Sequence, residues 1–188
     1  MAVRANGAST VENSAKRKFA QALEELLKGK NLDDIQVSEI VLKAGLSRRT
    51  FYRHFQDKYD LASWFFSQFF EGSFGQITEG ADWETAFLKY LAICEQKAAV
   101  LRNAYSSRDV NGLRNYDIDV TRKTYETYLI AKGADIRSKE MKFAIEIAAR
   151  GGTDMVIRWL ICGMKEEKEV LADLIKRTLP REVLAYLE

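Results

Sequence analysis

Residues 44–55, AGLSRRTFYRHF, decide the fold of this chain. Gly45 follows an apolar-patterned segment and is suited to the positive φ that ends a helix. Ser47 is suited to cap the next helix by accepting a hydrogen bond from the backbone N–H near Thr50. Two helices are therefore predicted to meet across a tight turn. This arrangement is typical of a helix-turn-helix unit, which presents its second helix to the major groove of DNA.

Two amphipathic segments precede the turn and complete a three-helix unit. The first covers residues 14–28, carries one apolar stripe and stops at Gly29. The second carries Val37, Ile40, Val41 and Ala44 at helical spacing. Gln36 is a poor cap for this second helix, so we expect its start to fray. Residues 11–58 are predicted to form a helix-turn-helix DNA-binding domain.

The helix after the turn has a core face and an outward face. At about 100° per residue, Phe51 and Phe55 fall on the same side and are expected in the core. The predicted DNA contacts lie on the outward face and at the start of the next helix: Arg48, Arg49, Thr50, Tyr52, Arg53, His54 and Lys58.

These residue types suit both bases and phosphates. Arginine pairs bidentately with guanine edges, and threonine or tyrosine hydroxyls meet phosphate oxygens. Asp57 is suited to cap the next helix, whose first turn brings Lys58 near the same DNA backbone. Two alternatives remain open: the ring of Tyr52 covers the small core, or the hydroxyl of Thr50 only begins the helix.

Positive charge is concentrated around this helix. Residues 43–58 hold five basic residues and one acid, a net charge of +4, whereas the whole chain carries +2. A compact basic patch is what an electrostatic contact with phosphates needs. Charge alone also fits a solvated helix face. The aromatic and turn residues around the patch favour the DNA interpretation.

Residues 14–61 resemble the DNA-binding domain of the TetR (tetracycline-repressor-like) family of transcriptional regulators. The resemblance is carried by Ile40, residues 44–47, residues 50–52, His54-Phe55, Lys58 and Leu61. It implies that Arg48, Arg49, Thr50, Tyr52 and His54 are recognition-helix contacts, and that Lys58 binds phosphate. Two positions depart from the family pattern: Arg49 stands where small residues or lysine are frequent, and Gln36 replaces the usual cap.

Residues 59–188 are predicted to form a larger helical ligand-binding and dimerisation domain, which makes the chain all-α with about nine helices. Expected helices cover 58–73, 82–102 with Asp82 as its cap, 120–131, 138–162 with Ser138 as its cap, and 166–179. The polar segment 103–119 has no assigned helix, and Asp117 and Asp119 near its end are expected in a solvated loop.

Aromatic residues of this second domain are candidates for an effector pocket. The predicted lining residues are Trp64, Phe87, Tyr90, Tyr105, Tyr125, Tyr128 and Trp159. Aromatic residues at helical spacing also form ordinary core, so this alternative stays open. No effector is named by the sequence.

The segment 138–162 is apolar on two faces, and both have to be buried. The second face, with Phe143, Ile147 and Ile157, packs either on its own domain or on a neighbouring chain. The resemblance implies a homodimer, because in TetR-like proteins the last two long helices of each subunit form a four-helix interface. The predicted interface residues are Ile145, Ala148, Gly152, Met155, Trp159, Leu171, Leu174 and Ile175. Residues 159–165, WLICGMK, are also similar to the C-terminal signature of the branch containing dihydroxyacetone-kinase regulators.

Other classes of protein are poorly supported. The chain has neither a Gly-rich phosphate loop nor a G-x-S-x-G elbow, so an enzyme is not expected. Its two cysteines and one histidine suggest neither a disulfide framework nor a metal site, and they favour a cytoplasmic setting without a cofactor. Neither a signal peptide nor a membrane span is expected.

The function predicted is a TetR-type regulator, a repressor that binds a palindromic DNA operator as a dimer and is released by a small-molecule effector. The alternative is a helical adaptor that binds protein only.

Overall fold

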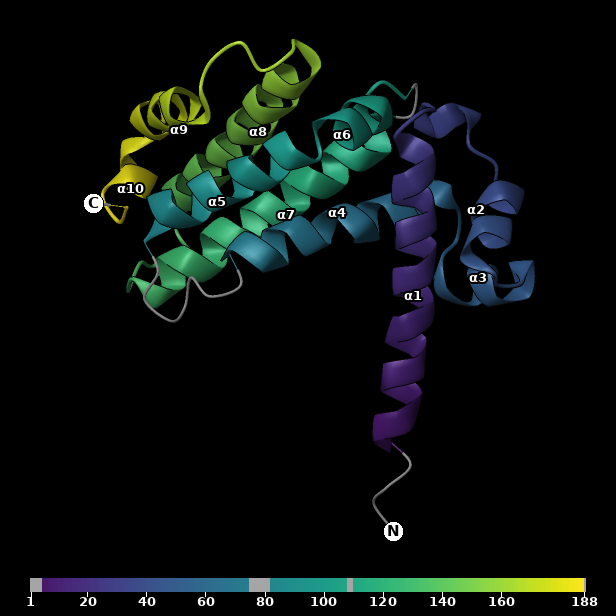
Figure 1. The fold of residues 1–188 in the computed structure, drawn as a ribbon. Coiled ribbons are helices and arrows are strands. Elements are labelled where there is room, and N and C mark those ends of the chain that lie inside the picture. The colour runs from purple at the N-terminus through teal and green to yellow at the C-terminus, as the bar shows by residue number, and fades with distance from the viewer. Residues whose placement is uncertain (1–4, 75–81, 108–109, 188) are drawn as a thin grey trace.

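The computed structural model describes residues 5–74, 82–107 and 110–187, which form ten α-helices, one 3-10 helix and no strand. The long helix α1 (Ala5–Leu27) stands between two groups of helices (Figure 1). On one side lie the short 3-10 helix η1 (Leu32–Asp34), α2 (Val37–Ala44) and α3 (Arg48–His54). On the other side lie α4 to α10. The all-α prediction, with a helix-turn-helix unit followed by a larger helical domain, is confirmed.

The turn between α2 and α3 forms as the sequence predicts. Gly45 ends α2 in the left-handed region with a φ of 64°. The Ser47 hydroxyl then accepts a 3.0 Å hydrogen bond from the backbone N–H of Thr50 and so caps α3. Both features act within a few residues, because each satisfies backbone N–H or C=O groups that have no hydrogen-bond partner at the end of a helix.

The start of α2 is held differently from the expectation. The carboxylate of Glu39 accepts a 3.0 Å hydrogen bond from the backbone N–H of Gln36 and also pairs with the ammonium of Lys30. An acid in the first turn also suits the positive end of the helix dipole. The weakness of Gln36 as a cap, on which the expectation of a frayed start depends, is therefore offset by Glu39.

Aromatic rings form the centre of the small N-terminal core. Phe19 of α1 contacts Phe51 and Phe55 of α3 edge-on, with ring centroids 5.2 and 6.4 Å apart. All three side chains are buried, as predicted for the two phenylalanines of α3. This packing fixes the rotation of α3, so its opposite face is directed outward.

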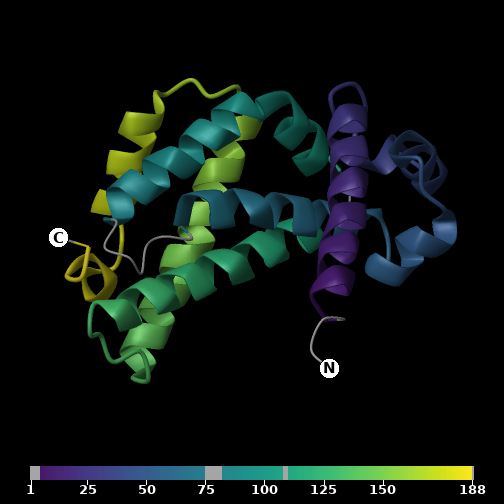
Figure 2. The same cartoon turned by 60° about the horizontal axis from the view of Figure 1, so that its bottom comes forward.

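Seven helices form the larger domain: α4 (Lys58–Phe74), α5 (Trp83–Gln96), α6 (Ala98–Tyr105), α7 (Val110–Ala131), α8 (Lys139–Ile161), α9 (Lys168–Arg177) and α10 (Arg181–Leu184). Helix α4 runs between α5 and α7 (Figure 2), and α7 packs along α8. The three predicted caps are present. Asp57, Asp82 and Ser138 accept hydrogen bonds from first-turn backbone N–H groups of α4, α5 and α8.

Three helix boundaries differ from the prediction. The helix expected over 82–102 is divided at Lys97 into α5 and α6. The helix expected from residue 120 begins at Val110, because Leu113 and Ile118 are buried and compensate for weak helix formers around them. The segment expected as one helix over 166–179 is α9, and α10 follows it.

The expectation of a solvated loop at Asp117 and Asp119 is wrong, because both residues lie within α7. Asp119 is exposed, whereas Asp117 is only 2% exposed. The sequence also predicts a loop marked by Gly72, Gly75 and Gly80; Gly72 instead lies in the last turn of α4, and Gly75 and Gly80 lie outside the described residues. No helix among the described residues is long and apolar enough to cross a membrane.

Candidate nucleic-acid interface and regulatory cavity

The outward face of α3 carries the predicted contacts. Arg48, Arg49, Tyr52 and Arg53 are exposed, whereas Thr50 and His54 are half-buried. The ring of Tyr52 is 52% exposed and leans edge-on against Phe51 at 5.4 Å. The tyrosine therefore covers part of the core with its ring while its hydroxyl end stays at the surface. The ring contact agrees with the interpretation that Tyr52 covers the small core, and a contact of its hydroxyl with DNA stays a prediction.

The charge on this face is not neutralised within the described residues. None of the ion pairs formed there involves the guanidinium of Arg48, Arg49 or Arg53. The nearest polar contact is between Arg53 and the His54 ring, 3.4 Å apart. Three cations that have no acidic partner in this part of the chain form a surface suited to a polyanion.

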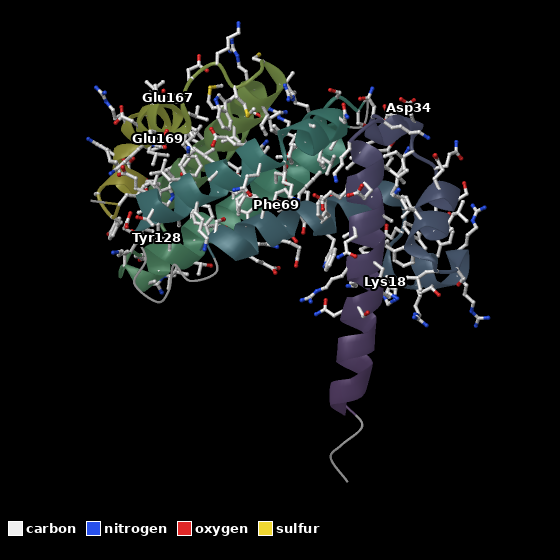
Figure 3. All side chains as sticks on the ribbon, viewed as in Figure 1. Lys18, Asp34, Phe69, Tyr128, Glu167 and Glu169 are labelled. Atoms are coloured by element: carbon white, nitrogen blue, oxygen red, sulfur yellow. The ribbon has the colours of Figure 1, made fainter. Side chains whose placement is uncertain are left out.

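The basic surface extends to α1, which holds none of the predicted DNA contacts. Lys18 lies on α1 beside α3 (Figure 3) and lines one groove with Lys43 of α2. Lys16 lies over the rings of Phe55 and Trp64, with its ammonium 5.8 Å from each centroid. The sequence signal for this extension is the run of three basic residues at 16–18.

Lys58 begins α4 as predicted, but its ammonium points into the protein. It donates hydrogen bonds of 2.7 and 2.9 Å to the carbonyl oxygens of Asp33 and Ile35. These two bonds use two of the three ammonium donors. The side chain therefore fastens the first turn of α4 to η1 and keeps one donor for another acceptor.

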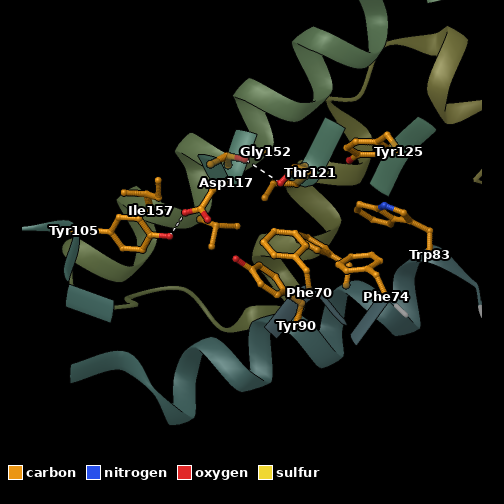
Figure 4. Close-up of a pocket in the computed structure, with 14 residues that line it drawn as sticks. Phe70, Phe74, Trp83, Tyr90, Tyr105, Asp117, Thr121, Tyr125, Gly152 and Ile157 are labelled. Atoms are coloured by element: carbon orange, nitrogen blue, oxygen red, sulfur yellow. Dashed lines mark hydrogen bonds between the residues drawn. The ribbon is translucent and has the colours of Figure 1, made fainter. Parts of the chain in front are cut away.

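A cavity with a volume of about 30 Å³ lies inside the larger domain between α4, α5, α7 and α8 (Figure 4). Four of the predicted pocket residues line it: Phe87, Tyr90, Tyr105 and Tyr125. The other three lie elsewhere. Trp64 packs on Phe55 with centroids 5.9 Å apart, Tyr128 is buried under the ammonium of Lys132, and Trp159 donates from its ring nitrogen to the carbonyl of Glu166.

Asp117, which is not among the residues predicted for the pocket, is the acid of this cavity. Its carboxylate accepts a hydrogen bond from the hydroxyl of Tyr105 (Figure 4). Burial raises the pKa of the Asp117 carboxyl to about 7, and the Tyr105 hydrogen bond opposes this rise. Burial also raises the pKa of the Cys94 thiol to about 12, so this neighbour stays neutral. Asp117 therefore titrates near neutrality inside a cavity whose lining is mainly aromatic and apolar.

Most of the predicted interface residues face their own subunit. Ile145, Ala148, Trp159, Leu171 and Ile175 are buried in the core of the single chain, and Gly152 is half-buried. Met155 and Leu174 are exposed. The exposed apolar residues of α8 and α9, which share only Met155 and Leu174 with the predicted set, are Phe143, Ile147, Met155, Ile161, Val170 and Leu174.

A tightly held helix-turn-helix unit with a basic outward helix, joined to a larger helical domain, defines a DNA-binding transcriptional regulator. The chain belongs to the TetR family. Residues 20–63 match the family described as "Bacterial regulatory proteins, tetR family", and residues 81–181 match the "Transcriptional regulator C-terminal region". The family predicted from residues 14–61 is confirmed, and the protein is a transcription factor rather than an enzyme.

Solved structures with the same fold include three regulators. The dihydroxyacetone kinase operon activator DhaS is 19% identical with a TM-score of 0.62, over 88% of this chain and 93% of that chain. The TetR family repressor AlkX from Dietzia sp. is 17% identical with a TM-score of 0.55, over 89% and 94%. A tetR-family transcriptional regulator from Streptomyces coelicolor is 13% identical with a TM-score of 0.58, over 92% and 88%. At these identities the likeness concerns the fold. No curated protein matches the sequence.

Proposed function

We propose that this protein is a dimeric repressor that binds a palindromic DNA operator and is released by a small-molecule effector. The observation that carries the proposal is the exposed cluster of Arg48, Arg49 and Arg53 on a helix whose rotation is fixed by Phe51 and Phe55. In this proposal residues 11–58 form the DNA-binding domain, and residues 59–188 form the effector and dimerisation domain. The setting is the cytoplasm.

The roles on α3 follow from side-chain chemistry. Arg49 and Arg53 read base edges, because a guanidinium pairs bidentately with guanine. Arg48, Thr50, Tyr52 and His54 position the helix on the phosphates and sugars. The remaining donor of the Lys58 ammonium contacts a phosphate at the start of α4. These assignments divide the surface into residues that set sequence preference and residues that set overall affinity.

A dimer is needed because α3 is short. One helix of seven residues reaches few base pairs, whereas two helices related by a dyad read half-sites in successive major grooves. For the interface we propose the exposed face of α8, where the ring of Phe143 is 70% exposed and Ile147 lies one turn further on. The exposed Val170 and Leu174 of α9 extend it. Exposed apolar residues gathered on two helices are typical of a subunit interface.

Release by an effector requires a link between the cavity and α3. Tyr105 lines the cavity from α6, and two residues further on the Ser107 hydroxyl donates to the carboxylate of Asp33 in η1. The carbonyl of the same Asp33 holds Lys58. A ligand that moves α6 therefore changes the support of η1 and of the first turn of α4, which follows α3 in the chain. Such a ligand weakens DNA binding if it favours an arrangement in which the two α3 helices are wrongly spaced.

Selection of bound sequences from random duplex DNA tests the proposal. We expect enrichment of an inverted repeat whose half-sites are about one helical turn apart, or a multiple of it. The control is the same selection with Arg49 and Arg53 both replaced by alanine, which should recover no common sequence. A helical adaptor, the alternative function, predicts that the unmodified protein enriches no sequence.

A further inference from the structure

The cavity of the larger domain is walled by aromatic rings. The centroids of Phe70 and Tyr90 lie 4.5 Å apart, and those of Trp83 and Phe87 lie 4.7 Å apart. Tyr125 stacks on Trp83 at 6.2 Å. The faces of such rings carry negative electrostatic potential, so they attract cations as well as apolar groups.

Asp117 places a carboxyl group in this aromatic surrounding. The side chain is 2% exposed and is directed into the cavity (Figure 4). Tyr105 is its hydrogen-bond donor, and within the described part of the chain it forms no ion pair with a lysine, arginine or histidine. A carboxylate buried without a counter-charge costs free energy, so the charged form of Asp117 lowers the stability of the fold.

The polar groups beside Asp117 are neutral and supply no counter-charge. Thr121 and Thr153 bond to each other through their hydroxyls at 3.2 Å. Burial raises the pKa of Tyr90 well above its ordinary value, so that hydroxyl stays neutral. The cavity thus combines one acid, neutral hydroxyls and aromatic faces. A ligand with a positive charge can pair with the acid, donate hydrogen bonds to the hydroxyl oxygens and lie against the aromatic faces.

We propose that the cavity binds a small organic cation, an alkylammonium whose charged nitrogen meets Asp117 and whose carbon atoms contact Phe70 and Trp83. This inference rests on the proposed effector function and gives it a ligand class. The cavity volume of about 30 Å³ is close to that of one water molecule, so a larger ligand enters only if the rings move apart. A ligand of a few carbon atoms requires the smallest movement.

Isothermal titration calorimetry with three molecules of one carbon skeleton tests the ligand class. Isobutylammonium, isobutanol and isobutyrate are added to the unmodified protein without DNA at about pH 8, above the pKa of Asp117. We expect isobutylammonium to bind at least about ten-fold more tightly than the other two. At about pH 6 its binding should also release a proton, because the cation favours the charged carboxylate.

Two variants locate the charge that is responsible. Asp117→Asn keeps the size of the side chain and should weaken isobutylammonium binding by about ten-fold or more. Asp119→Asn removes an acid two residues away on the surface, where it pairs with Arg122, and should leave binding unchanged. Circular dichroism melting shows whether each variant is folded. If Asp117→Asn does not fold, the comparison of the three molecules on the unmodified protein still decides the question.

The proposal is overturned if isobutanol or isobutyrate binds as tightly as isobutylammonium, or if none of the three binds at millimolar concentration. Because the titration contains no DNA, such a result leaves the DNA-binding proposal standing. Conversely, a failure to bind any duplex alongside selective binding of the cation would refute the regulator and leave the cavity assignment in place.

Discussion

The ammonium of Lys58, the first residue of α4, donates a 2.7 Å hydrogen bond to the carbonyl oxygen of Asp33 in η1. The carboxylate of the same Asp33 accepts hydrogen bonds from the hydroxyls of Tyr59 and Ser107. One residue beside the DNA-binding helices is therefore bonded to both α4 and the end of α6. A shift of α4 or α6 would therefore also shift η1, which belongs to the same N-terminal unit as α3.

Replacing Lys58 with alanine should have two separate effects. The carbonyls of Asp33 and Ile35 lose their donor, so we expect the free energy of unfolding to fall by about 1–3 kcal/mol, measured by urea denaturation. If the third donor contacts phosphate, affinity for every duplex should fall and the slope of log K against log salt should decrease by about 1. An unchanged slope together with lower stability would show that Lys58 acts only within the protein.

Replacing Arg49 or Arg53 with alanine should relax sequence preference. The loss of a guanidinium that reads a base should cost about 1–3 kcal/mol of discrimination at one position of the operator. The measurement is competition binding with every single-base variant of the selected site. Arg137→Ala is a matched control, because Arg137 is exposed and pairs with Asp135 in the connection between α7 and α8. An unchanged profile for both variants of α3 would refute base recognition by these arginines.

The dimer proposal is tested by placing a charge on the exposed face of α8. Phe143→Glu should convert a dimer to monomers in analytical ultracentrifugation, because burying an unpaired carboxylate in an interface costs several kcal/mol. Leu42→Glu is the control, since Leu42 of α2 is even more exposed and lies outside the proposed interface. Trp159 is unsuitable for this test because it is buried within the subunit. A dimer that survives Phe143→Glu would exclude this face.

Asp117 should make stability depend on pH. Burial raises its folded pKa from an ordinary 3.8 to about 7, so folding favours the protonated form. Relative to Asp117→Asn, the unmodified protein should lose stability as pH rises from about 4 to about 7, by a few kcal/mol in all, with no further loss above that range. Tyr90, Tyr105 and Cys94 stay neutral over this range because burial raises their pKa values. Parallel unfolding curves for the two proteins would contradict this account.

The features that the sequence predicts well are those whose causes lie within a few residues. Gly45 and Ser47 determine the turn because a left-handed residue and a hydroxyl cap act locally. The same is true of Asp82 and Ser138 at the starts of α5 and α8. The spacing of Phe51 and Phe55 is likewise sufficient to place the opposite face of α3 outward.

Features that depend on distant contacts were harder to predict. The break at Lys97 has neither glycine nor proline to mark it; its ammonium instead pairs with Glu24 of α1. The sequence assigns Asp117 to a loop because three weak helix formers, Asn111, Gly112 and Asn115, interrupt the pattern from which α7 would be predicted. For α8, periodicity identified two apolar faces but not the neighbour that covers each. The buried face holds Trp159, whereas Phe143 and Ile147 stay exposed.

Binding of a fluorescent duplex that carries the selected palindrome, titrated by anisotropy at several salt concentrations, tests the central claim most directly. The account predicts two chains per duplex, an affinity at least about 1,000-fold above that for a scrambled duplex, and a log K that falls linearly with log salt. Absence of binding to either duplex at low salt, or equal binding to both that does not change with salt, would contradict it.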